Sequence, residues 1–228
     1  MAVLDPEETH NLVRVLRLKV GARVAVADGQ GRTWEAVVQA LEPTGARLKV
    51  VQELAPWGES SLKLVLGIGL AKGEAMDQVI RQATEMGVQH LIPFMSARSE
   101  KLTAERAARR RHRWQRLARE SLKSCQRSCI PQIDLPQDFV EILAGFEAAK
   151  LLFWEEERDG GLKSCLDQPP PPSARLLVGP EGGFTAREVA QAQEAGFAVV
   201  SLGPRRLKVE SAVLAALTLV QYAWGDLA

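Results

Sequence analysis

Two segments of the sequence combine glycine with charge in a way that suits the binding of a small ligand. Residues 178–185 read VGPEGGFT, and glycines at this density let a backbone approach a ligand closely while Pro180 stiffens the turn. Residues 202–211 read LGPRRLKVES and place three cations beside the carboxylate of Glu210. Each segment also has a plainer interpretation. The first could be a tight turn before a helix, and the second could be a basic turn exposed to solvent.

A third segment, residues 98–127, carries eleven Lys and Arg residues against three acidic ones. Drawn as a helix that turns about 100° per residue, it separates an apolar face from a basic face. Such a basic stripe is the electrostatic footprint of a protein that binds nucleic acid, and a solvated face with internal ion pairs is the alternative. The residues expected to contact RNA from this stripe are Arg109, Arg113, Arg116, Lys123 and Arg127.

Other catalytic patterns are weak. The glycines at 67, 69 and 73 do not have the G-x-G-x-x-G spacing of a dinucleotide-binding loop. The three cysteines and three histidines show no convergent ligand spacing, so we expect no metal. No G-x-S-x-G motif supports a serine hydrolase.

Composition excludes several classes of protein. The 228 residues are 46% hydrophobic and 25% charged, which is typical of a globular chain. The net charge is +1, so positive charge for a nucleic acid must be local. The longest nearly apolar run, residues 212–224, is shorter than the roughly 20 residues of a membrane span, so we expect no membrane partner. The acidic start and the odd number of cysteines favour a cytoplasmic location.

These segments belong to a chain whose pattern changes near residue 61. Alternating strands at 22–27, 33–41 and 46–53 predict a small β-barrel or sandwich over residues 1–61. Strands then alternate with helices, which predicts a parallel α/β sheet over residues 62–228. The expected strands are 62–70, 88–94, 150–154, 176–178 and 197–202, the expected helices are 74–86, 103–125, 137–146, 185–195 and 210–224, and 159–173 is expected to be a polar loop.

The elements predict where the loops must lie. In open α/β sheets ligands bind beyond the carboxyl ends of the strands, and both glycine-containing segments follow strands. The helix at 210–224 is apolar on all sides, so we expect it to be buried, either in the core or in a homodimer interface.

The motifs, taken together, resemble the SPOUT class of RNA methyltransferases, and more narrowly the bacterial 16S ribosomal RNA (uracil-N3) methyltransferase family. Their order and spacing match over essentially the whole chain. The segments that carry the resemblance are LLVGPEGGFT, SLGPRRLKVESA, His10 with Arg14-Val15-Leu16-Arg17, Lys72-Gly73-Glu74-Ala75-Met76, Thr84-Glu85-Met86-Gly87-Val88 and Arg98-Ser99-Glu100-Lys101.

The resemblance implies a fold and an activity. It implies an N-terminal PUA-like β-barrel that docks RNA, where Arg14 and Arg17 would contribute, and a C-terminal α/β domain with a trefoil knot. It also implies S-adenosyl-L-methionine as cofactor, ribosomal RNA or the small ribosomal subunit as partner, and a homodimer. The expected reaction is methylation of N3 of a uridine in 16S ribosomal RNA, in ribosome biogenesis.

The expected site residues lie in or next to the two loops and at the end of the expected strand 150–154. Arg205 is expected to stabilise developing negative charge or to grip a phosphate. Glu210 is expected to act as base or orienting carboxylate, and a structural role at the start of the last helix is its alternative. The expected cofactor-binding residues are Phe153, Trp154, Val178, Gly179, Pro180, Glu181, Gly182, Gly183, Leu202, Gly203, Leu207, Val209, Ser211 and Ala212.

Three alternatives stay open on the sequence. The chain could be a non-catalytic RNA- or ribosome-associated binding protein whose glycine segments are merely turns. It could be an RNA methyltransferase of the same class that acts on another nucleotide. It could also be a metabolic enzyme that binds an anion at the N-terminus of the helix at 185–195.

Overall fold

The computed structural model describes residues 1–42, 44–55, 57–158 and 161–227, and the chain folds into two compact units. The first unit comprises residues 1–59 together with 127–129, and the second comprises the rest. The division therefore falls after Glu59, close to the expected position at residue 61. The inclusion of residues 127–129 in the first unit was not expected from the sequence.

The first unit is built on an antiparallel sheet of four strands in the order β1-β4-β3-β2. The strands are β1 (Ala2–Val3), β2 (Arg23–Ala27), β3 (Thr33–Glu42) and β4 (Gly45–Leu54). The three expected strands are confirmed as β2, β3 and β4. They could be predicted because the alternation of apolar and polar side chains along a strand is visible in a short stretch of sequence. This small antiparallel sheet confirms the β-structured unit that the sequence predicts at the start of the chain, and among the described residues its named strand pairs run from β1 to β2.

Two helical turns precede β2 and were not expected. Helix α1 (Pro6–His10) begins after Asp5, whose carboxylate accepts a hydrogen bond of 2.8 Å from the N–H of Glu8. It continues into a π-helical turn, η1 (Asn11–Val15), which buries Leu12 against the sheet core. Arg17 follows with a φ of 54°, a left-handed conformation that is uncommon for a residue with a side chain.

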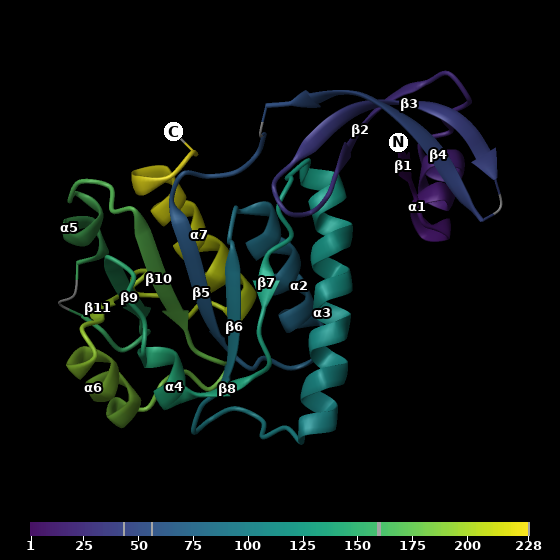
Figure 1. Ribbon diagram of the computed structural model, residues 1–228. Helices are drawn as coiled ribbons and strands as arrows, with labels where there is room; N and C mark the ends of the chain where they lie inside the picture. Colours follow the sequence, from purple (N-terminus) through teal and green to yellow (C-terminus); the bar gives the residue numbers. More distant parts are fainter. Residues whose placement is uncertain (43, 56, 159–160, 228) are drawn as a thin grey trace. The chain divides into compact units, whose positions relative to one another are not determined.

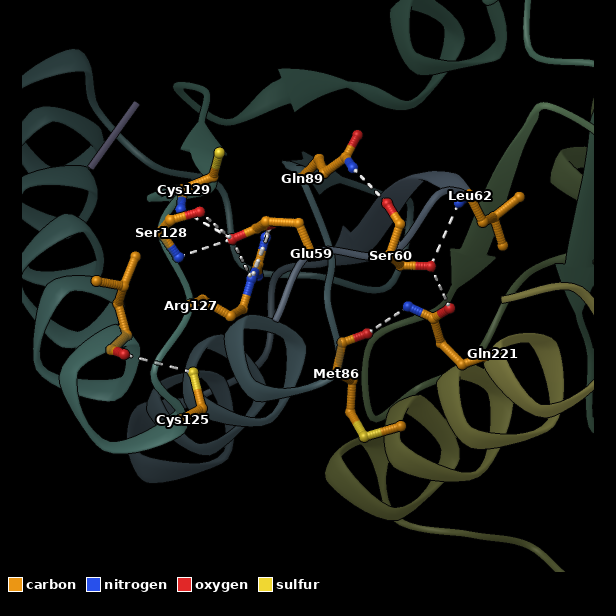
Figure 2. A network of polar contacts seen from close by, with 11 residues as sticks. Glu59, Ser60, Leu62, Met86, Gln89, Cys125, Arg127, Ser128, Cys129 and Gln221 are labelled. Atoms are coloured by element: carbon orange, nitrogen blue, oxygen red, sulfur yellow. Dashed lines mark hydrogen bonds and ion pairs between the residues drawn. The ribbon is translucent and has the colours of Figure 1, made fainter. Parts of the chain in front are cut away.

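A carboxylate holds residues 127–129 in the first unit (Figure 2). Glu59 accepts hydrogen bonds from the backbone N–H groups of Ser128 (2.9 Å) and Cys129 (2.8 Å) and from the Arg127 guanidinium (2.8 Å). Burial, with the nearby charge of Glu59, raises the pKa of the Cys129 thiol. The Arg127 side chain is only 2% exposed, so the expectation that Arg127 contacts RNA is wrong.

The second unit contains a seven-stranded sheet whose named pairs are all parallel (Figure 1). The order is β11-β9-β10-β5-β6-β7, and β8 also pairs with β6. The strands are β5 (Lys63–Gly69), β6 (His90–Met95), β7 (Gln132–Ile133), β8 (Gln137–Asp138), β9 (Ala149–Phe153), β10 (Ser173–Val178) and β11 (Ala198–Val200). The expected parallel α/β architecture is confirmed.

Helices cover both faces of this sheet (Figure 1). One core cluster joins the strands to α2 (Gly73–Glu85), α3 (Ala104–Cys125), α5 (Leu162–Leu166) and α7 (Val209–Trp224). A second cluster joins the strands to α4 (Phe139–Leu143) and α6 (Ala186–Glu194). Consecutive residues of β5 alternate between the clusters, Leu64 and Leu66 in the first and Val65 in the second, as the strand pleat requires.

Two expected elements differ from the structure. Helix α4 is five residues long, shorter than the expected 137–146. It starts late because residues 137 and 138 pair with β6 as β8, and it ends at Leu143 because Ala144 has an extended backbone. Helix α5 forms inside the expected polar loop at 159–173, with Leu162 buried in the core. Residues 159 and 160 of that loop lie outside the described residues.

Helix α7 is only half buried. Val213, Ala216, Leu217 and Val220 are fully buried in the core. Leu214, Leu219 and Tyr222 are 38%, 40% and 66% exposed, so the core of the single chain buries one side of the helix, and the expected homodimer interface stays a prediction for the other side. Within the described residues no helix combines the length and apolar character that crossing a bilayer would need.

Candidate functional site

A cavity of about 660 Å³ lies at the carboxyl ends of β9, β10 and β11 in the second unit. Pockets for small molecules and cofactors usually measure about 300–1,000 Å³, so the cavity can hold one. Its walls are the loop that follows β10, the segment 201–212 that leads from β11 into α7, and the end of β9. Both glycine-containing segments therefore meet at one site, as the position of strand ends predicts.

The structure brings the expected site residues together with one exception. Arg205, Glu210 and every expected cofactor-binding residue other than Ser211 line the cavity. Ser211 is exposed in the first turn of α7, because the helix begins at Val209 and each residue turns about 100° from the last. The lining residues that were not expected are Ala75, Arg98, Glu155, Ser201, Arg206 and Lys208.

The loop at residues 179–184, here the glycine-rich loop, needs glycine for two reasons. Gly183 has a φ of +67°, and its N–H donates a 2.8 Å hydrogen bond to the carbonyl of Pro180. A Cβ on Gly183 would lie 2.2 Å from Oε1 of Glu155, and a Cβ on Gly182 would lie 2.9 Å from Cβ of Arg98. The left-handed conformation thus disfavours a larger residue at Gly183, and the close approach of Arg98 Cβ disfavours one at Gly182.

An aromatic cluster anchors the end of the glycine-rich loop. Phe184 is 1% exposed and stacks on Phe94 of β6, with ring centroids 6.0 Å apart, while Phe139 lies 5.8 Å away. Helix α6 then begins with a capping box, in which Thr185 and Glu188 satisfy each other's backbone N–H groups. The loop therefore starts and ends on rigid elements.

Side chains link this loop to the loops that follow β5 and β6. Glu181 accepts a 2.7 Å hydrogen bond from the N–H of Lys72, at the start of α2. Glu188, only 6% exposed, accepts a 2.9 Å hydrogen bond from the N–H of Ala97. The carboxyl ends of three neighbouring strands, β10, β5 and β6, are therefore joined by hydrogen bonds at the site.

The second wall of the cavity is charged. Arg205, Arg206 and Lys208 are exposed there, and the partly buried Glu210 follows them in the first turn of α7. Gly203 has a φ of +103°, and Ser201 accepts a 3.2 Å hydrogen bond from its N–H. The cations on this wall can attract an anionic partner. The carboxylates of Glu210 and Glu155, which also line the cavity, can attract a positively charged group of a ligand.

Helix α3 presents the expected basic face. Arg109, Arg116 and Lys123 are exposed, and the opposite face is buried through Trp114 and its neighbours. Part of this face is engaged in ion pairs. Arg113 Nε donates to Asp77 Oδ1 of α2 at 3.1 Å, and Arg116 Nε lies 3.7 Å from Glu120 Oε1. These ion pairs fit the interpretation as a solvated face, and the exposed cations of the stripe are compatible with either interpretation. In the first unit, Arg14 and Arg17 are exposed.

The chain is similar to known proteins along nearly its whole length. A model described as an RNA methyltransferase domain matches residues 58–221, and one described as an RNA methyltransferase PUA domain matches residues 4–51. Ribosomal RNA small subunit methyltransferase E of Bacillus subtilis is 29% identical, over 95% of this chain and 88% of that protein. The protein of the same name from Synechocystis sp. is 33% identical, over 95% and 71%.

Two solved structures are similar to this chain along nearly its whole length. A ribosomal RNA small subunit methyltransferase E from Neisseria gonorrhoeae, bound to S-adenosyl methionine, has a TM-score of 0.90 at 30% identity and covers 100% of this chain and 93% of its own. A putative methyltransferase from Legionella pneumophila in complex with the same cofactor has a TM-score of 0.89 at 29% identity, with 99% and 93% covered.

Proposed function

This chain belongs to the RNA methyltransferase family, and from that premise we propose that it transfers the methyl group of S-adenosyl-L-methionine to N3 of a uridine in 16S ribosomal RNA. The family expected from the sequence motifs is confirmed, and so is the S-adenosylmethionine-dependent ribosomal RNA methyltransferase activity of that family. The observation that carries the proposal for this chain is the cavity, where two glycine-containing loops meet at the carboxyl ends of parallel strands.

The residues around the cavity fit this cofactor. Its volume suits a nucleoside with an amino-acid arm, and residues 179–183 of the glycine-rich loop form one of its walls. Phe153, Leu202 and Leu207 would hold apolar parts of the ligand and exclude water. The cofactor supplies a methyl group activated by a sulfonium, and the remaining tasks fall to the protein.

Those tasks are positioning and removal of a proton. Uracil N3 carries a proton and is a poor nucleophile until that proton leaves. We assign Glu210 to accept it while the N3–methyl bond forms and the sulfur–methyl bond breaks. Arg205 would stabilise the negative charge that develops on the base or hold a neighbouring phosphate. Holding N3 in line with the methyl carbon supplies much of the rate acceleration.

The basic residues supply the RNA surface in this proposal. Arg109, Arg116 and Lys123 of α3 are exposed and would neutralise phosphates. Arg113 would contribute less, because its guanidinium donates a 3.1 Å hydrogen bond to Asp77, whereas Arg116 lies 3.7 Å from Glu120 in a looser ion pair. Arg14 and Arg17 of the first unit, which matches a PUA domain model, would add contacts to the RNA backbone.

We also propose a homodimer, formed in the cytoplasm through the exposed side of α7. Leu214, Leu219 and Tyr222 form an apolar face on that helix, and such faces mark interaction sites on otherwise polar proteins. The trefoil knot implied by the family resemblance stays a prediction for this chain.

Titration calorimetry with S-adenosyl-L-methionine tests the proposed cofactor. We expect saturable binding of one molecule per chain. A plain RNA-binding protein, the main alternative, would show no heat of binding at any ligand concentration, and that result would contradict the proposal.

A further inference from the structure

We propose that Arg98 is a positioning residue for methyl transfer, which holds the glycine-rich loop in the shape that accepts the methyl donor. Arg98 opens the motif Arg98-Ser99-Glu100-Lys101, which lies outside both glycine-containing loops. The inference rests on the proposed function, because it assumes that the cavity binds S-adenosyl-L-methionine.

The guanidinium of Arg98 spans the glycine-rich loop. Its Nη1 donates hydrogen bonds to the carbonyl oxygens of Gly182 at 2.8 Å and Phe184 at 3.3 Å. These two carbonyls lie on either side of Gly183, the residue with the φ of +67°. A single side chain therefore restrains the backbone before and after the one left-handed residue of the loop.

Arg98 is itself held in place before it reaches the loop. Its N–H donates to Oγ of Ser96 at 3.3 Å, and the preceding N–H, from Ala97, donates to the buried carboxylate of Glu188 at 2.9 Å. The stem of Arg98 lies directly against Gly182, where a Cβ would be 2.9 Å from Arg98 Cβ. The side chain thus starts from a fixed backbone and packs along the loop that it restrains.

The chemistry of the contact favours arginine. A guanidinium is planar, permanently charged and carries several donors, whereas a lysine ammonium is a flexible point charge. Hydrogen bonds from a charged donor are roughly twice as strong as neutral ones. Without this restraint the loop would sample other conformations, and cofactor binding would have to select the competent one, which lowers the apparent affinity.

Arg98 also lines the cavity, so a direct contact with the carboxylate of the cofactor is the competing role. The two roles predict different ligand dependence. A positioning residue affects every ligand that the glycine-rich loop embraces, including 5′-methylthioadenosine, which lacks the amino-acid carboxylate. A direct partner of the carboxylate affects only ligands that carry it.

The test measures the Kd of both ligands by calorimetry for the wild-type chain and for Arg98→Ala and Arg98→Lys, with unfolding temperatures recorded in the absence of ligand. Arg187→Ala, an exposed arginine in the first turn of α6, is the matched control. We expect Arg98→Ala to raise the Kd of both ligands at least about tenfold, which is about 1.4 kcal/mol. Arg98→Lys should give a smaller rise for both, and the control none.

Three other results would overturn the inference, and they differ in what they say about the proposed function. Unchanged affinity in both Arg98 variants, with binding by the wild type, would overturn this inference alone. A loss confined to S-adenosyl-L-methionine would replace positioning by direct contact. A wild-type chain that binds neither ligand would overturn the proposed function and this inference with it. If Arg98→Ala does not fold, Arg98→Lys with a wild-type unfolding temperature decides the question by the same comparison of ligands.

Discussion

Gly183→Ala probes the glycine-rich loop with one added methyl group. Gly183 has a φ of +67°, where a residue with a Cβ is strained by roughly 1–2 kcal/mol. The new Cβ would also lie 2.2 Å from Oε1 of Glu155, far inside the 3.4 Å at which ordinary contacts begin. The carboxylate of Glu155, or the loop, must therefore shift by more than an ångström within the wall of the cavity.

A second glycine separates these two effects. Gly196, after α6, has a φ of +86°, and a Cβ there would meet nothing within 4 Å. Gly196→Ala should therefore carry the conformational strain without any collision. Both variants should lose about 1–2 kcal/mol of unfolding free energy. Gly183→Ala alone should lose cofactor affinity, at least about tenfold, because only its methyl group displaces part of the cavity wall.

Paired measurements decide the matter. Denaturant unfolding gives the stability loss of each variant, and calorimetry with S-adenosyl-L-methionine gives the Kd. Equal Kd values for Gly183→Ala and the wild type would refute the claim that the glycine-rich loop embraces the cofactor. An equal loss of affinity in Gly196→Ala would show instead that strain in the domain, and not the local collision, governs binding.

Three further changes test other parts of the structure. Glu59→Gln should lower the unfolding free energy by about 3–5 kcal/mol, because it removes the negative charge that faces the buried guanidinium of Arg127. An unchanged thermal unfolding curve would contradict that role. Filter binding to single-stranded RNA at several salt concentrations gives the slope of log affinity against log salt. Arg109→Ala and Arg116→Ala should each reduce the magnitude of that slope by about 0.7, because each removes one phosphate contact. An unchanged slope would show that the substituted residue does not contact RNA. Tyr222→Glu places a charge on the exposed apolar face of α7 and should convert the proposed dimer to monomers, as measured by sedimentation velocity. A wild-type chain that sediments as a monomer would exclude the proposed dimer.

Much of the second unit could be predicted from the sequence because its signals are local. Short apolar runs located β5 and the last residues of β10, and the expected helix 74–86 closely matches α2, which Gly87 follows with a φ of +79°. The two loops of the cavity carry their own glycine and charge, so their residue types indicated a ligand site. Their meeting at one cavity followed from the rule that carboxyl ends of parallel strands share an edge.

What could not be predicted depends on residues far apart in the sequence. Arg98 and the carbonyl that it holds on Gly182 are 84 positions apart, and Glu59 is 68 positions from Arg127. No periodic pattern in the sequence connects such distant pairs. Arg127 was therefore predicted to contact RNA, whereas the structure buries its side chain against Glu59. Helix α5 escaped prediction for another reason, since its five residues are too few for a helical pattern to emerge.

Direct observation of methyl transfer tests the central claim. The purified chain is incubated with isotopically labelled S-adenosyl-L-methionine and small ribosomal subunits from cells that lack it, and the RNA is digested and analysed by mass spectrometry. We predict label on N3 of a uridine in 16S ribosomal RNA, in an amount that approaches one methyl group per subunit. Label on another atom, or none on RNA although the cofactor binds, would contradict the account.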